Sequence, residues 1–286
     1  MIKKLLLCLM ALTLCASCAQ DDKKWIEKML IIDHQLNQKG ILVLPKKIKR
    51  NLAVVLLSGS GPNDADYTID GIGLYQELAE ALAEAGIVSF RMEKRSRYTD
   101  VITTIQQEIL DDAQLVIDLL SQSYEKVIVL GHSLSAMVLP ALKADGMIML
   151  SGSVSELEDI YADQLMRDAD KAQRKQIQEE LLMIQNLQED RGFSWFGIKE
   201  SYWISLDKLD LAEKRQDLDV PVLVIHGSED DVIDASEFKK MKMILKDKNA
   251  TCILMNGLDH YLRADGSLHL EQSVILEIVS WILNFS

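Results

Sequence analysis

The sequence predicts an α/β fold in which a mostly parallel central sheet is flanked by helices and carries an inserted helical cap. At 286 residues, with 48% hydrophobic and 26% charged side chains, the chain can bury the core of one large domain. Short apolar runs alternate with longer helical patterns, which is typical of parallel strands joined by helices. The alternation stops across residues 153–216, a charged helical stretch that is too long for a simple loop. We interpret this stretch as a cap inserted before the strand at 222–225.

The elements follow one another in a regular order. Strands are predicted at 29–32, 41–45, 52–57, 87–90, 126–130, 147–150, 222–225 and 252–255, and helices at 74–85, 105–120 and about 268–283. The first two strands form an antiparallel hairpin, and the turn-rich residues 58–64 follow the third strand. The first helix has leucines at helical spacing, and Gly86 can serve as its C-terminal cap.

The first residues have the pattern of an export signal, with a basic start, an apolar run at 5–14 and small residues before Cys18. The run is too short to span a bilayer. Small residues directly before a cysteine resemble the lipobox of bacterial lipoproteins, which implies removal of residues 1–17 and lipidation of Cys18. The mature domain would then span residues 18–286. Cys15 stands where such signals usually carry Leu, so an ordinary signal peptide cleaved nearby is the alternative.

Composition adds to this expectation. Residue 19 is Ala rather than Asp, so the common inner-membrane retention signal is absent, and residues 20–22 are similar to acidic signals for surface export. We expect an exported protein, anchored by lipid to the outer membrane of a diderm bacterium, and we leave open whether it faces the cell surface. The net charge of −13 argues against nucleic acid as a partner. Beyond Cys18 the sequence contains one further cysteine, Cys252, so no intramolecular disulfide is expected.

Residues 131–135, Gly-His-Ser-Leu-Ser, stand where the strand at 126–130 should turn into a helix. A serine on such a sharp, strained turn projects its hydroxyl toward a substrate, and small flanking residues let strand and helix approach. Ser133 is therefore the predicted nucleophile. Gly131 supplies one small residue, whereas Ser135 replaces the usual glycine on the other side. A turn serine without a catalytic role is the alternative.

Elimination among the histidines predicts the general base. The sequence contains five of them: His34, His132, His226, His260 and His269. His260 follows the last predicted strand through a tight loop at the same sheet edge as Ser133, and it is our choice. Strand alternation points His132 away from Ser133, and the other three have plausible structural or surface positions.

The orienting acid is expected after a strand that lies between Ser133 and His260 in the sequence. Asp230 is the predicted acid, because it follows the strand at 222–225 and lies three residues beyond Gly227. The nearby acids remain open as alternatives: Asp231, Asp234 and Glu229.

Backbone N–H groups are predicted to form the oxyanion hole, where each donor contributes about a hundred- to a thousandfold in rate. One is that of Leu134, which follows the nucleophile at a helix N-terminus. The other is that of Ser60, in the loop after the strand at 52–57, where neighbouring glycines allow unusual dihedral angles.

From about Met29 onward the sequence resembles the α/β-hydrolase superfamily, whose catalytic residues follow the order Ser, Asp, His. Residues 58–64, Ser-Gly-Ser-Gly-Pro-Asn-Asp, resemble the oxyanion stretch of a branch akin to dienelactone hydrolases, serine aminopeptidases and bacterial esterases. Residues 221–233 resemble its strand-and-acid motif, in which an aliphatic residue, here Ile233, follows the acid by three positions. That spacing favours Asp230 over its neighbours.

Two segments depart from that branch. Its members usually carry Gly-His-Ser-x-Gly-Gly, against Ser135 and Ala136 here, and Asp-Lys-Arg-Gly, against Glu-Lys-Arg-Ser at 93–96. Neither change removes a predicted catalytic group. Both can alter the shape of the pocket.

We predict a serine hydrolase that cleaves carboxylic esters through an acyl-enzyme, with a small-molecule substrate. No metal or organic cofactor is expected, because the sequence lacks a His-x-x-x-His pattern, paired cysteines and a phosphate-binding glycine motif. Aromatic side chains of the cap are candidates to line the substrate pocket, with packing inside the cap as the alternative: Trp195, Tyr202 and Trp203.

Two other functions remain open. A serine aminopeptidase-like enzyme acting on short peptides needs a carboxylate in the cap to hold the substrate amine, and Glu156, Glu158 and Asp159 are candidates. The second is a non-catalytic surface lipoprotein that keeps the fold and binds a ligand. The oligomeric state is not predicted.

Overall fold

The computed structural model describes residues 23–99, 102 and 104–285, so the predicted signal and Cys18 lie outside the described residues. Its centre is an eight-stranded sheet in the order β1-β2-β6-β3-β7-β8-β11-β12. The strands are β1 (Trp25–Asp33), β2 (Gln38–Pro45), β3 (Leu52–Leu57), β6 (Val88–Met92), β7 (Lys126–His132), β8 (Gly146–Leu150), β11 (Val222–Gly227) and β12 (Ala250–Met255). The pairs β1–β2 and β2–β6 are antiparallel, and all others are parallel.

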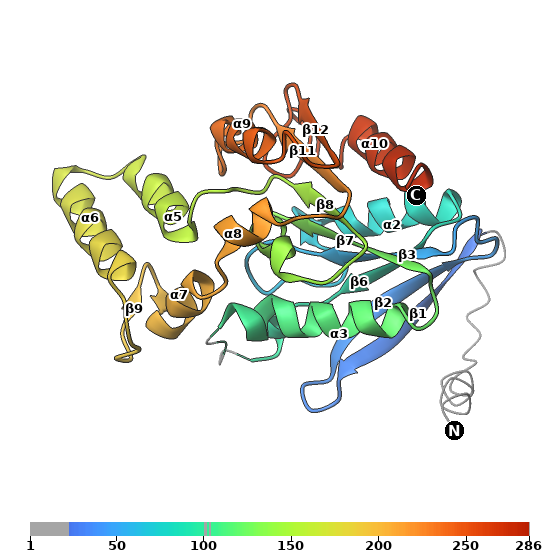
Figure 1. Cartoon of the computed structure of the whole chain (residues 1–286), viewed down its shortest axis with the longest axis horizontal. Helices are drawn as coiled ribbons and strands as arrows, with labels where there is room; N and C mark the ends of the chain where they lie inside the picture. Colours follow the sequence, from blue (N-terminus) through green and yellow to red (C-terminus); the bar gives the residue numbers. More distant parts are fainter. Residues whose placement is uncertain (1–22, 100–101, 103, 286) are drawn as a thin grey trace.

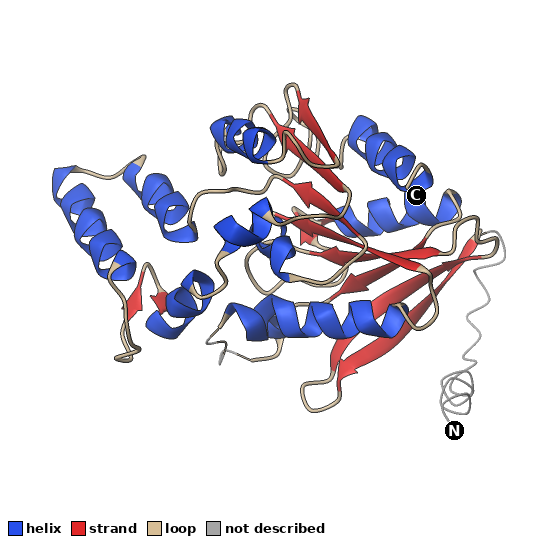
Figure 2. Ribbon diagram, viewed as in Figure 1, coloured by secondary structure: helices blue, strands red, loops and turns tan. Residues whose placement is uncertain are grey.

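Helices cover both faces of this sheet (Figures 1 and 2). On one face lie α2 (Leu74–Glu84) and α10 (Gln272–Leu283), and on the other lie α3 (Asp111–Leu120), α4 (Leu134–Val138) and α9 (Ala235–Ile244). The central strands are buried along nearly their whole length, which explains why they read as continuous apolar runs.

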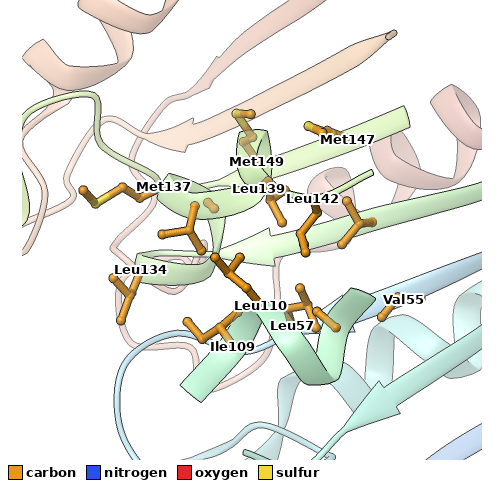
Figure 3. Close-up of a cluster of buried hydrophobic side chains, with 14 of the residues drawn as sticks. Val55, Leu57, Ile109, Leu110, Leu134, Met137, Leu139, Leu142, Met147 and Met149 are labelled. Atoms are coloured by element: carbon orange, nitrogen blue, oxygen red, sulfur yellow. The ribbon is translucent and has the colours of Figure 1, made fainter. Parts of the chain in front are cut away.

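Apolar packing fixes the short helix α4, which follows Ser133. Figure 3 shows Leu134 and Met137 of this helix among side chains from β3, β8 and the approach to α3. Burying one such side chain stabilises the fold by about 1.5–3 kcal/mol. The apolar core therefore fixes the position of α4 and of the backbone at Ser133, which precedes it.

The segment between β8 and β11 forms a separate layer over one end of the sheet (Figure 1). It contains α5 (Leu157–Met166), α6 (Lys171–Gln185), α7 (Glu200–Asp207), α8 (Leu211–Gln216) and the short hairpin of β9 (Ser194–Trp195) and β10 (Ile198–Lys199). We call this segment the cap. It occupies the stretch in which the insertion at 153–216 is predicted.

The predicted mostly parallel sheet with flanking helices is confirmed. Several details differ from the prediction. A π-helical turn (Gln106–Leu110) precedes α3, a small hairpin of β4 (Thr68–Ile69) and β5 (Ile72–Gly73) follows the early loop, and α9 was not predicted. Helix α9 buries only two apolar side chains, Phe238 and Met241, so its apolar pattern is weak. Among the described residues, no helix combines the length and apolarity needed to cross a membrane.

Candidate active site

Three loops meet at the carboxyl edge of the sheet. Ser133 follows β7, Asp230 follows β11 and His260 follows β12. Because β7, β8, β11 and β12 are successive parallel neighbours, the loops after them emerge on the same side. The fold therefore brings the three predicted residues together.

Ser133 sits on a strained turn. Its φ of 55° and ψ of −121° place a non-glycine residue outside the usual regions, while its N–H is held by the carbonyl oxygen of Leu150 at 2.9 Å. Strand and helix cross very closely here, because a Cβ on Gly131 would lie 2.8 Å from the backbone nitrogen of Ala136. Ser133 remains partly exposed on this turn.

The three side chains form a continuous hydrogen-bonded chain. His260 Nε2 lies 3.1 Å from Ser133 Oγ, and His260 Nδ1 lies 2.8 Å from Asp230 Oδ2. Because a carboxylate only accepts, Nδ1 carries the proton and Nε2 is free to accept the serine proton. These distances lie within hydrogen-bond reach for a nucleophile, its base and the group that orients the base.

Asp230 is held as a carboxylate. Its other oxygen accepts the N–H groups of Val232 at 2.9 Å and Ile233 at 2.8 Å. Burial raises the pKa of Asp230, whereas the hydrogen bonds from His260 and the Ile233 N–H lower it. The lowering effects outweigh burial, so the pKa is below its usual value. Of the alternatives, Asp231 and Glu229 are exposed, and Asp234 caps α9 through the N–H of Ser236.

Gly227 brings the base and the acid close together. A Cβ at this position would lie 2.2 Å from the carbonyl oxygen of Leu258, so only glycine lets the loop that carries His260 cross the end of β11. His226, just before it, is buried and donates from Nε2 to the carbonyl oxygen of Ile233 at 2.9 Å. Burial lowers the pKa of His226, which keeps the ring neutral beside Asp230.

The loop after β3 lies directly against the nucleophile. A Cβ on Gly59 would lie 3.1 Å from Ser133 Cβ, so Ser60 stands beside the reacting hydroxyl. Asn63 donates from its amide to the carbonyl oxygens of Gly59 at 3.0 Å and Ser60 at 2.9 Å. Leu134 is the first residue of α4, where N–H groups have no partner inside the helix. Both predicted oxyanion donors therefore flank Ser133.

Ser135 and Ala136, which replace the two glycines of the usual motif, are both accommodated by their neighbours in the structure. Ser135 is buried and donates from Oγ to the carbonyl oxygen of Ser58 at 2.6 Å, which ties α4 to the loop after β3. Ala136 faces Gly152, whose added Cβ would lie 2.9 Å from that of Ala136. The usual motif has a glycine where this chain has Ala136. Here the room for the Ala136 methyl group comes from the missing side chain of Gly152, on the loop after β8.

A cleft of about 200 Å³ opens onto Ser133 and His260. Its lining combines both oxyanion residues with the edge of the sheet and one helix of the cap. The cap contributes Ser153, which precedes α5, and α5 itself contributes four residues: Leu157, Ile160, Tyr161 and Gln164. Their spacing of three, four and seven residues marks one helix face, a signal present in the sequence that we did not use.

The three predicted aromatic residues of the cap do not line this cleft. Trp195 donates from its ring to Glu200 at 3.0 Å, Tyr202 is buried against Glu108, and Trp203 packs edge-on against Tyr161 with ring centroids 6.0 Å apart. The structure thus corrects their placement. Tyr202 packs where the cap meets the body, whereas these contacts of Trp195 and Trp203 lie inside the cap, which was the alternative interpretation.

The hydrogen-bonded Ser, His and Asp at the carboxyl edge of an α/β sheet have the arrangement of a serine-hydrolase site. Comparisons with known proteins give independent information on the class of protein. No protein-family model matches the chain. Esterase EstD from Thermotoga maritima is 28% identical over 267 residues, which cover 85% of this chain. The chain spans 65% of the length of that relative.

Solved structures give the same fold. Est1E from Butyrivibrio proteoclasticus, with ferulic acid bound, has a TM-score of 0.62 at 15% identity and covers 89% of this chain and 98% of its own. The esterase PF2001 from Pyrococcus furiosus has a TM-score of 0.60 at 11% identity, covering 94% and 95%. The predicted α/β-hydrolase fold and the resemblance to this superfamily are therefore confirmed.

Proposed function

We propose that the chain hydrolyses carboxylic esters of small molecules through an acyl-enzyme. The hydrogen-bonded chain from Ser133 through His260 to Asp230 carries this proposal. Ser133 attacks the ester carbonyl while His260 takes its proton, and the N–H groups of Ser60 and Leu134 stabilise the oxyanion. His260 then protonates the departing alcohol, and a water molecule activated by the same ring releases the acid.

The similarity to EstD supports an ester rather than another acyl substrate, because that relative is an esterase. The bound ferulic acid of Est1E is an aromatic carboxylic acid, which is the kind of product that ester cleavage releases. Both observations concern those proteins. They make esters the first substrates to test here.

The cleft favours esters over peptide N-termini. An aminopeptidase needs a carboxylate near the site to hold the substrate ammonium, and the lining of this cleft contains no Asp, Glu, Lys or Arg. The candidate carboxylates Glu156, Glu158 and Asp159 are not part of that lining. A neutral cleft binds an uncharged acyl or alcohol group without desolvating a charge.

A pair of assays tests the proposal. Wild-type protein should hydrolyse p-nitrophenyl acyl esters and should show little activity on aminoacyl p-nitroanilides. A fluorophosphonate probe should label wild type and leave Ser133→Ala unlabelled. Activity on the anilides alone would favour the peptidase, and an unlabelled, inactive wild type would favour a non-catalytic ligand-binding protein.

We also propose that the chain is exported and anchored to a membrane through Cys18, which would present the site outside the cytoplasm. The pattern of small residues before Cys18 supports this proposal. In a diderm host, full-length protein should incorporate labelled palmitate and partition into detergent, whereas Cys18→Ala should do neither. Equal labelling of both proteins would contradict the anchor.

A further inference from the structure

We propose that Tyr67 and His132 are positioning residues, which hold the backbone of His260 and the loop after β3 in register around Ser133. This inference rests on the proposed function, because it concerns how the base of that reaction is kept in place. Neither residue belongs to the Ser133–His260–Asp230 chain. Both are buried in the body of the protein; His132 does not line the cleft, whereas Tyr67 is also part of its lining.

His132 joins two parts of the site that are distant in sequence. Its Nε2 lies 2.8 Å from the carbonyl oxygen of His260, and its Nδ1 lies 2.8 Å from the hydroxyl of Tyr67. The carbonyl can only accept, so Nε2 carries the proton and donates to His260. Nδ1 is then an acceptor, and the Tyr67 hydroxyl donates to it. The contacts thus select one tautomer.

Tyr67 extends this chain to the oxyanion side. Burial raises the pKa of the Tyr67 hydroxyl, and the nearby backbone of Gly59 partly opposes that rise. The approach is close, because a Cβ on Gly59 would lie 2.7 Å from that oxygen. Polar contacts therefore run from Gly59 through Tyr67 and His132 to His260, and they connect the loop before Ser60 with the base.

The backbone of Tyr67 is bent to make this contact. Its φ of 51° is in the left-handed region, which is rare for a bulky aromatic residue. Such strain persists only where the surroundings over-determine the conformation, and it is concentrated at functional sites. Ser133 has a φ of 55°, so His132 contacts two strained residues, one that follows it in the sequence and one that is hydrogen-bonded to its ring.

The environment keeps His132 uncharged. Burial lowers its pKa to about 3, and proximity to His260 lowers it as well. The rings of His132 and His260 are 4.7 Å apart between centroids, and the ring of Tyr261 lies against both, 5.6 Å from His132 and 5.4 Å from His260. A charged His132 would repel the imidazolium that His260 becomes during the reaction. A neutral donor holds the backbone of His260 without this penalty.

Substitutions of His132 can distinguish the contribution of its Nε2 hydrogen bond from that of its Nδ1 hydrogen bond. His132→Gln keeps a donor near the position of Nε2, His132→Asn keeps only an acceptor near that of Nδ1, and His132→Phe removes both. Tyr67→Phe removes the partner of Nδ1. Tyr75→Phe is the matched control, because Tyr75 is also buried and donates its hydroxyl to the carbonyl oxygen of Leu57 at 2.8 Å, without contacting His132 through a hydrogen bond.

The primary measurement is kcat and KM on p-nitrophenyl acetate, with thermal unfolding to verify the fold. We expect His132→Phe and His132→Asn to lower kcat by about 10- to 100-fold with KM within about twofold, since a misplaced base costs rate rather than binding. His132→Gln should retain most of kcat, Tyr67→Phe should lose about tenfold, and Tyr75→Phe should match wild type.

Two results would overturn the inference. One is a folded His132→Phe variant with kcat within twofold of wild type, and the other is an equal loss in His132→Gln and His132→Asn. If wild type neither turns over esters nor reacts with the fluorophosphonate, the proposed function fails by itself. Positioning is then judged by the low-field NMR signal of the His260 Nδ1 proton, which should persist in wild type and His132→Gln and disappear in His132→Asn. Its persistence in all three proteins would refute positioning.

Discussion

The two walls of the cleft are built in different ways. The sheet side consists of loops tied to the body by hydrogen bonds, as in the contacts of Asp230 with Val232, Ile233 and His260. The cap side is a single helix, α5, which buries only Leu157 and Ala162. Outside it, α6 is exposed along almost its whole length, with Leu182 60% exposed.

The attachments of the cap show the same contrast. Gln164 of α5 donates to the carbonyl oxygen of Val232 at 3.0 Å, and Glu237 of α9 accepts the N–H groups of Val154 at 2.9 Å and Ser155 at 2.8 Å. Apolar packing also attaches the end of the cap nearest the body, because Tyr202, Trp203 and Leu206 belong to the same buried cluster as the sheet. The contrast is therefore with α5 and α6, which bury few side chains. Under the proposed function, we therefore expect changes on the sheet side to affect the chemistry and changes in α5 to affect substrate binding.

Asp230→Asn should have the largest effect on the sheet side. An amide can donate to His260 Nδ1 and so favours the wrong tautomer, which should lower kcat by about 10⁴-fold. The measurement is steady-state hydrolysis of p-nitrophenyl acetate. Asp231→Asn is the matched control, because Asp231 is exposed, and it should retain activity within about threefold. A similar loss in both variants would contradict the assignment of the acid.

Gly59→Ala tests the loop after β3. The new methyl group would lie 2.7 Å from the Tyr67 hydroxyl and 3.1 Å from Ser133 Cβ, so the loop must shift away from the nucleophile. We expect kcat to fall by about 10²- to 10³-fold, as when an oxyanion donor is lost. Gly192→Ala in the cap also strains a backbone, at φ +86°, but meets no atom within 4 Å.

The comparison is informative only if both variants fold, which circular dichroism verifies. Gly192→Ala should lose some thermal stability and keep its kcat. An unchanged kcat in Gly59→Ala would show that the loop does not supply a donor to the oxyanion.

Acid should destabilise the sheet side before the cap. Burial lowers the pKa of His132 to about 3 from 6.5, so the unfolded chain binds more protons between these values and stability falls as pH decreases below 6.5. Burial raises the pKa of Glu200 in the cap, but hydrogen bonds from Trp195 and Arg191 lower it to about 2 from 4.5, so its contribution decreases only below 4.5.

Urea unfolding at pH 7.5, 6 and 5 measures this slope. Replacing His132 by Gln should remove up to about 1.4 kcal/mol per pH unit from it, since one proton is then no longer taken up on unfolding. The exposed His34 provides the control, and His34→Gln should leave the slope unchanged. A slope unaffected by His132→Gln would show that the ring is not held neutral.

Gln164→Ala should have the smallest effect, on binding rather than chemistry. It removes one hydrogen bond between α5 and the loop that carries Asp230, worth about 0.5–1.5 kcal/mol. We expect KM to rise by about two- to tenfold with kcat within twofold. Gln185→Ala loses an exposed hydrogen bond to Asp159 inside the cap and should change neither value. A large loss of kcat in Gln164→Ala would mean that the cap also positions the acid.

Local patterns in the sequence were sufficient to predict the succession of the eight strands along the chain and the strand-to-helix turn at Ser133. They also predicted Asp230 and His260, because each follows a recognisable apolar strand at a short, turn-rich distance. The hydrogen bonds of Asn63 to Gly59 and Ser60 were not predicted, since an amide in a loop has no periodic signal. The aromatic residues of the cap were misplaced for a related reason: composition does not state which face of a helix meets the cleft.

What the sequence determined by itself is therefore the α/β fold and the three residues that succeed its strands. Tertiary structure alone decided that Gly152 faces Ala136, that α5 rather than Trp195 or Trp203 lines the cleft, and that Tyr67 is hydrogen-bonded to His132. The physical reason is the separation along the sequence over which each effect acts. Burial periodicity and turn chemistry act over a few neighbouring residues, whereas His132 and His260 meet across 128 positions, and only the packed sheet brings such residues together.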